Sequence, residues 1–148
     1  MKILGISLLL CSTMILFFSG CTKITSNVSP DVSINEYKNF YVVPSFDDRR
    51  GVGEAISDDL KSRGFNVEVG PDIQIPDTAD VEVTYEAKWV WDKEYYLSDL
   101  VIFFKDPDRA SMIASGESRH PSLDRKPVDE MVGEILDPIF GTSPQMTK

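Results

Sequence analysis

The side chains best suited to chemistry in this sequence are its two cysteine thiols. Cys11 lies inside an apolar run over residues 3–18, and Cys21 comes shortly after that run. A basic start, an apolar run and small residues at its end are the three parts of a secretory signal peptide. The run is shorter than the roughly 20 residues of a membrane-spanning helix. Loss of residues 1–20 would leave Cys21 as the only thiol, so we expect no disulfide within the chain.

The residues Phe18, Ser19, Gly20 and Cys21 resemble the bacterial lipobox, although Phe18 replaces the usual Leu. The resemblance implies cleavage between Gly20 and Cys21 and attachment of lipid, palmitate included, to the Cys21 thiol. Thr22 stands where an Asp often retains Gram-negative lipoproteins at the inner membrane, so the periplasmic face of the outer membrane is favoured. The alternatives are an ordinary signal peptide followed by a chance cysteine, or an uncleaved anchor helix.

The only histidine, His120, follows Ser118 by two residues. On a strand this spacing places both side chains on one face. A nucleophilic triad also needs an orienting carboxylate and an oxyanion hole. Residues 116–120 are not a hydrolase elbow, because a histidine replaces the final glycine of that motif. We therefore expect no catalytic residue and interpret His120 as a loop residue before Pro121.

Two further patterns are weak indications of a bound ligand. The Gly-Val-Gly segment at 51–53 lies between a predicted strand and helix, but Ile56 replaces the third glycine of a nucleotide-binding loop. Three carboxylates lie close in the sequence without EF-hand spacing, namely Asp99, Asp106 and Asp108. Zinc is poorly supported, because there is one histidine and Cys21 is expected to be acylated. We expect neither a metal nor a cofactor.

An aromatic cluster is the best candidate for an interaction patch in the folded part. Its members are Trp89, Trp91, Tyr95 and Tyr96. Trp89 and Trp91 share the parity of the apolar residues earlier in the same predicted strand, so packing in the core is the default interpretation. The alternative is an exposed patch at the end of a hairpin, suited to protein contact or glycan stacking.

The charge of the chain excludes one class of partner. There are 15 Lys and Arg against 24 Asp and Glu, which gives a net charge of -9. Such a balance repels nucleic acid and anionic lipid headgroups, and no run of basic residues offsets it. A length of 148 residues suits one domain.

The elements that must position these residues follow from hydrophobic periodicity. Residues 21–36, rich in Ser, Thr and Asn, are predicted to form a flexible tether with a reach of roughly 20 Å. Strands are predicted at 40–46, 65–69, 81–91, 95–105 and 112–117, and helices at 52–63 and 127–137. The strand at 95–105 has apolar residues of both parities, which predicts a central strand buried on both faces.

The order of these elements, β-α-β-β-β-β-α, predicts an α+β domain over residues 37–140, followed by a tail at 141–148. We expect a two-layer α/β sandwich, with a mostly antiparallel sheet of about five strands and both helices on one face. Segments of this domain resemble the bacterial lipoproteins of domain-of-unknown-function family 4136. The segments that carry the resemblance are 40–43, 64–65, 79–85, 100–102, 114–116 and 139–140. The family's usual Trp in the last hairpin is not evident, and the family implies no activity or catalytic residues.

Two functional hypotheses follow. The first is a non-enzymatic envelope lipoprotein, held to the membrane by its lipid, that binds another envelope protein or peptidoglycan through a sheet edge or the aromatic hairpin. The alternative is a small-ligand or lipid-binding auxiliary lipoprotein of a transport system. The first requires a filled core and an exposed patch, whereas the second requires an apolar cavity between helices and sheet. The sequence leaves the partner and the oligomeric state open.

Overall fold

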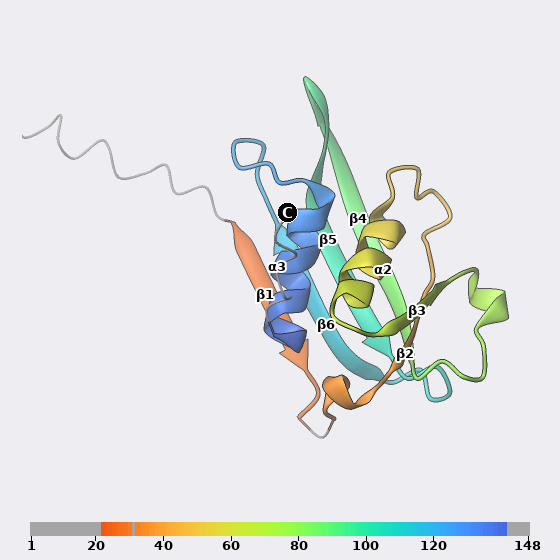
Figure 1. Ribbon diagram of the computed structural model, residues 1–148. Coiled ribbons are helices and arrows are strands. Elements are labelled where there is room, and N and C mark those ends of the chain that lie inside the picture. The colour runs from red at the N-terminus through yellow and green to blue at the C-terminus, as the bar shows by residue number, and fades with distance from the viewer. Residues whose placement is uncertain (1–21, 31, 142–148) are drawn as a thin grey trace, which may run out of the picture.

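The computed structural model describes residues 22–30 and 32–141 as a sheet with two helices on one of its faces (Figure 1). The strands are β1 (Lys23–Val28), β2 (Asn39–Val42), β3 (Asn66–Val69), β4 (Val81–Asp92), β5 (Glu94–Lys105) and β6 (Met112–Arg119). The helices are α2 (Val52–Ser62) and α3 (Val128–Phe140), with single 3-10 turns η2 (Ile34–Glu36) and η3 (Asp72–Gln74).

The sheet is mixed, with the order β1-β6-β5-β4-β2-β3. Strands β4, β5 and β6 form an antiparallel meander, whereas β2 runs parallel to both β3 and β4. Parallel neighbours need a crossover connection, and α2 supplies the one between β2 and β3. The predicted α+β class and the placement of both helices on one face are confirmed. The sheet has six strands instead of the expected five.

The sixth strand, β1, corrects the prediction of a flexible tether at residues 21–36. It pairs antiparallel with β6 in a register that runs from Lys23 opposite Arg119 to Val28 opposite Ala114. All six of its residues are exposed, so it shows no alternation of apolar and polar side chains. An edge strand of this kind joins the sheet through its backbone, which hydrophobic periodicity does not detect. After it, Ile34 is buried in the core.

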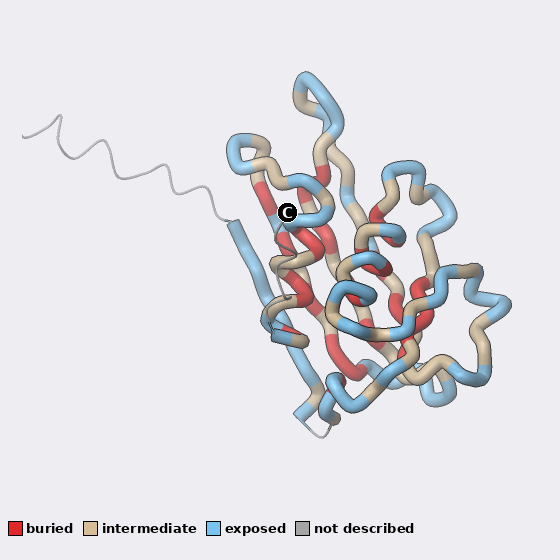
Figure 2. Tube along the Cα trace, viewed as in Figure 1, coloured by how far each residue is buried: buried red, intermediate tan, exposed pale blue. Residues whose placement is uncertain are grey.

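The core lies between the sheet and the helices, where the buried residues line up along the strands (Figure 2). On β4 the predicted alternation is confirmed, because Val81, Val83 and Tyr85 are buried. The helices contribute one face each, with Ile56 and Leu60 of α2 among the fully buried side chains. Helix α3 continues through Pro138 to Phe140, beyond the end that its proline had indicated.

Strand β5 is central, as predicted, but it is not buried on both faces. Leu100, Ile102 and Phe104 are fully buried against the helices, whereas Val101 and Phe103 lie half-buried on the uncovered face. A β-bulge interrupts the pairing of β4 with β5 next to Lys88 and Trp89. The bulge changes parity, so that beyond it the odd-numbered residues of β5 share a face with those of β4.

Gly116 of β6 lets α3 approach the sheet closely. A Cβ atom at this position would lie 2.5 Å from Cγ2 of Ile135, which is far inside van der Waals contact. Over residues 22–30 and 32–141, no helix is both long and apolar enough to cross a bilayer.

Candidate functional site

The β4–β5 hairpin projects beyond the helices (Figure 1). Aromatic residues lie on both of its strands near the turn. Trp91 and Tyr95 lie opposite each other, with ring centroids 5.1 Å apart. Their exposed fractions are 64% and 55%. Trp89 is half-buried against the core, and the Arg50 guanidinium lies 4.6 Å from its ring centroid and 4.8 Å from that of Tyr95. Core packing therefore describes Trp89 and is wrong for Trp91, which is exposed.

Tyr96 lies on the opposite face of the same hairpin, because side chains alternate along a strand. The Arg125 guanidinium stacks 4.6 Å from its ring centroid. Arg125 also donates to the Asp92 carbonyl at 2.8 Å and pairs with Glu94 at 3.1 Å. The four predicted patch residues are thus adjacent but divided between two faces, and only Trp91 and Tyr95 form an open aromatic surface.

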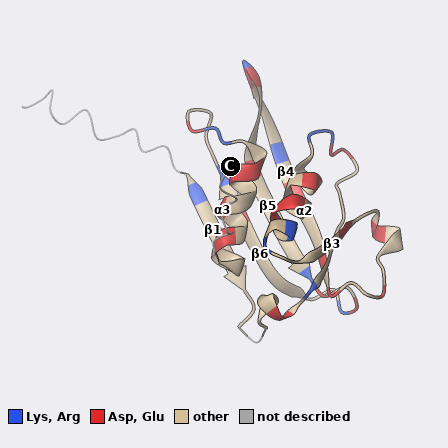
Figure 3. Ribbon diagram, viewed as in Figure 1, with Lys and Arg blue, Asp and Glu red and all other residues tan. Residues whose placement is uncertain are grey.

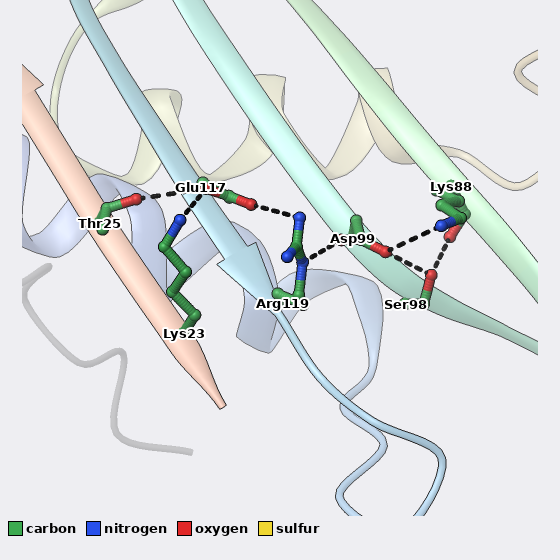
Figure 4. Close-up of polar contacts among 7 residues, drawn as sticks. All are labelled: Lys23, Thr25, Lys88, Ser98, Asp99, Glu117 and Arg119. Atoms are coloured by element: carbon green, nitrogen blue, oxygen red, sulfur yellow. Dashed lines mark hydrogen bonds and ion pairs between the residues drawn. The ribbon is translucent and has the colours of Figure 1, made fainter. Parts of the chain in front are cut away.

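A row of charged side chains crosses the uncovered face of the sheet (Figure 4). We call it the charge ladder, and it consists of Lys23, Glu117, Arg119, Asp99 and Lys88, from strands β1, β6, β5 and β4. The Glu117 carboxylate forms ion pairs with Lys23 at 3.2 Å and with Arg119 at 2.9 Å. Arg119 also binds Asp99, which lies 4.0 Å from Lys88.

The electrostatics of the charge ladder favour its ionised form. Partial burial opposes the charge on Asp99, but hydrogen bonds from Ser98 and Arg119 outweigh it and lower the pKa of the carboxyl. A shallow hollow lies over the ladder, lined by Glu86, Ala87, Lys88, Asp99, Val101, Glu117 and Arg119. This arrangement can recognise a polar surface.

The loop between β2 and α2 is organised by Asp48. Its carboxylate accepts hydrogen bonds from the backbone N–H of Val52 at 3.1 Å and of Gly53 at 2.8 Å, and from the Tyr85 hydroxyl at 2.5 Å. Burial opposes its charge, but these hydrogen bonds lower the pKa of Asp48. Burial beside this carboxylate raises the pKa of Tyr85. The N-terminus of α2, in the Gly-Val-Gly segment, is therefore already occupied by the Asp48 carboxylate of the same chain.

His120 is buried and lies between two carboxylates, so its interpretation as a plain loop residue is corrected. Its Nε2 is 2.7 Å from Oε2 of Glu134, and its Nδ1 is 3.0 Å from Oδ2 of Asp124. Burial disfavours the imidazolium, but the hydrogen bonds to Glu134 and Asp124 raise the pKa of His120. Sequence spacing gave no signal for Glu134, because α3 brings it in from a separate element.

The same cluster shows why Ser118 and His120 do not act as a catalytic pair. The Ser118 hydroxyl donates to Glu134 at 2.7 Å instead of to the imidazole. Ser118 is fully buried, so a substrate cannot reach its oxygen. The arrangement is suited to holding β6 against α3.

The three candidate metal carboxylates are not brought together. Asp99 belongs to the charge ladder, in the middle of β5, whereas Asp106 follows the end of that strand. Asp106 accepts hydrogen bonds from the backbone N–H of Asp108 and Arg109, both at 3.0 Å, which shapes a turn. In the part of the chain that the structure describes, no group of three or more His, Cys, Asp or Glu could hold a metal ion. The predicted lipidation and cleavage residues, Cys21 and Gly20, lie outside the described residues.

Comparison with known proteins relates the fold to solved bacterial structures. No protein-family model matches the sequence, and no curated protein matches it significantly. A PelC dodecamer from Paraburkholderia phytofirmans is similar with a TM-score of 0.59 and 9% identity, over 84% of this chain and 100% of that one. A PDZ domain protein from Parabacteroides distasonis is similar with a TM-score of 0.53 and 14% identity, over 86% of this chain and 36% of that one.

The third similar structure bears on the predicted family resemblance. It is a DUF4136 family protein from Bacteroides thetaiotaomicron, with a TM-score of 0.55 and 9% identity, over 82% of this chain and 97% of that one. At this identity the likeness concerns the fold alone. The chain has a fold like that of a protein of domain-of-unknown-function family 4136.

Proposed function

We propose that this protein is a bacterial envelope lipoprotein, anchored by lipid on Cys21, whose folded domain is a non-enzymatic interaction module. The observation that carries the proposal is the position of Cys21, between an apolar run and the first strand, which begins at Lys23. An acylated cysteine there would join the lipid almost directly to the sheet. Thr22 favours the periplasmic face of the outer membrane for this module.

The uncovered face of the sheet supports the interaction role. Half-buried Val101 and Phe103 form an apolar centre there, flanked by the charge ladder and by exposed β1 at the edge. An apolar centre with a polar rim is the usual anatomy of a protein interface. We assign this face to another envelope protein or to peptidoglycan. A second copy of the chain is included among the protein partners, since the similar PelC structure is a dodecamer.

The interior gives less support to a ligand carrier. The side chains between helices and sheet are almost completely buried and pack on one another, as with Phe40 and Phe104, whose ring centroids are 6.4 Å apart. A small-ligand or lipid carrier would need an apolar cavity in that space. The filled core therefore favours the interaction module over an auxiliary lipoprotein that carries a ligand.

Two measurements test the proposal. Replacement of Cys21 by Ala should abolish acylation and block release of residues 1–20, and mass spectrometry of the intact chain detects both changes. A photo-crosslinking amino acid at Val101 should capture an envelope component in intact cells. The matched control carries the same amino acid at Asp58, which is exposed on α2 at the opposite face. Unchanged processing of Cys21→Ala, or equal capture from both positions, would contradict the respective half of the proposal.

A further inference from the structure

The first described residue is held in place against another loop. The Thr22 hydroxyl donates to Oδ2 of Asp124 at 2.8 Å, and the same oxygen lies 3.0 Å from the His120 ring. Lys23 then begins β1. A lipid on Cys21 would therefore be one residue from a fixed point of the domain. The chain between the lipid and β1 is therefore too short to hold the domain away from the membrane that receives this lipid.

Several apolar side chains near that fixed point are exposed. Arg125 joins the connection at 120–127 to the turn of the β4–β5 hairpin through its contacts with Asp92 and Glu94. We call these two segments, residues 91–96 and 120–127, the hairpin end. Leu123 on the connection is 95% exposed, and Trp91 and Tyr95 on the hairpin are open to solvent as well. Figure 1 shows both segments at the end of the sheet where β1 begins.

The charge of the hairpin end differs from that of the whole chain. Its two segments contain three Lys or Arg residues and three Asp or Glu residues, whereas the chain as a whole carries -9. Figure 3 shows basic and acidic positions together on the hairpin turn, while acidic positions prevail on the helices. A balanced end escapes the repulsion from anionic headgroups that the rest of the domain experiences.

We propose that the hairpin end docks on the lipid surface of the membrane that holds the protein, with Trp91, Tyr95 and Leu123 entering the headgroup region. The inference rests on the proposed acylation of Cys21. Trp and Tyr rings favour the membrane interface, because each combines an apolar ring with a polar group. Lys93 at the turn can keep its ammonium group in water while its aliphatic stem lies along the surface. The docked hairpin leaves the uncovered sheet face free for a partner.

The two tryptophans of the chain provide the test. Full-length protein purified from membranes is reconstituted into phosphatidylethanolamine–phosphatidylglycerol vesicles that contain brominated lipid, which quenches nearby indoles. The variant Trp89→Phe reports on Trp91 alone, and Trp91→Phe reports on Trp89, about 7 Å further from the turn. We expect quenching of Trp91 to be at least twofold stronger than quenching of Trp89.

A second pair of variants, built on Trp89→Phe, tests the contribution of Leu123. Leu123→Ser should weaken the quenching of Trp91, because it removes an apolar contact with the bilayer. Ile73→Ser is the matched control, since Ile73 is also largely exposed but lies on η3, after β3 and outside the hairpin end. It should leave the quenching unchanged.

The outcomes separate docking from acylation. Mass spectrometry of the same sample reports the lipid on Cys21, and its absence overturns the anchor and the docking together. Acylated protein with equal, weak quenching of both tryptophans overturns the docking alone. Shielding of Trp91 from iodide without quenching by brominated lipid would also overturn it, because a protein would then cover the hairpin end.

Discussion

The imidazole Nε2 of His120 lies 2.7 Å from the Glu134 carboxylate, which joins the end of β6 to α3 inside the domain. Because the hydrogen bonds to Glu134 and Asp124 raise the pKa of His120, the folded state binds its proton more tightly than the unfolded chain does. This contribution to stability is fully present below the unfolded pKa of about 6.5 and is lost as the pH rises through the folded pKa.

We therefore predict that the free energy of unfolding falls as the pH rises above about 6.5 and that Glu134→Gln reduces this dependence. Urea unfolding at a series of pH values measures the first effect. The single histidine allows NMR titration of one ring resonance to measure the pKa directly. Glu130→Gln is the control, because Glu130 is exposed on the same helix and contacts Lys126 instead. A titration midpoint at or below 6.5 would contradict the prediction.

Asp48 should matter more for stability than its place in a surface loop suggests. Replacement by Ala removes the acceptor for two backbone N–H groups at the start of α2 and for the Tyr85 hydroxyl, and we expect a loss of about 2 kcal/mol. The neighbouring substitution Asp47→Ala removes only an exposed pair with Arg49 and should change little. Chemical denaturation of both variants makes the comparison.

The contribution of the Asp48 carboxylate to stability also depends on pH. The folded pKa of Asp48 is lowered, so its contribution is present above the unfolded value of 3.8 and is lost as the pH falls through the folded value. A double-mutant cycle with Tyr85→Phe should give a coupling of about 1 kcal/mol at neutral pH. Additive effects of the two substitutions would refute the coupling.

Gly116 is predicted to tolerate no side chain. Gly116→Ala would drive a methyl group into Ile135 and should cost about 1–3 kcal/mol, because α3 has to move away from β6. Gly133 on α3 is the opposite case, since a Cβ there meets nothing within 4 Å. Gly133→Ala should stabilise the helix by roughly 0.5–1 kcal/mol. Thermal unfolding of the two variants should therefore shift in opposite directions.

The sequence predicted strands and helices correctly where burial of one face produces a periodic pattern of apolar residues. The alternation on β4 correctly predicted the buried face through Val81, Val83 and Tyr85, and the apolar stripe at 52–63 predicted α2. The bulge beside Lys88 and Trp89 left no pattern in the sequence, because a single extra residue changes parity without changing composition. The second face of β5 was expected to be covered for a different reason, since Val101 and Phe103 are apolar but lie half-buried on the face without helices.

The candidate site was harder to predict than the fold. The aromatic residues of the hairpin were identified, but the exposure of Trp91 depends on where α2 and α3 end relative to the strands. The contacts of His120 with Glu134, and of Arg50 with Trp89, join residues distant in the chain. Such pairs are set by tertiary packing, so local spacing carries no information about them.

The pairing of β1 with β6 also affects the order in which the strands of the sheet can pair during folding. Lys23 is opposite Arg119, so the first strand to be synthesised must wait for the last one before it finds a partner. Closing so long a segment costs chain entropy, and the meander of β4, β5 and β6 can form earlier. The polar side chains of β1, Thr25 and Asn27 among them, suit a strand that stays unpaired in water during this delay. We therefore expect the amino-terminal edge to be the last part of the sheet to join.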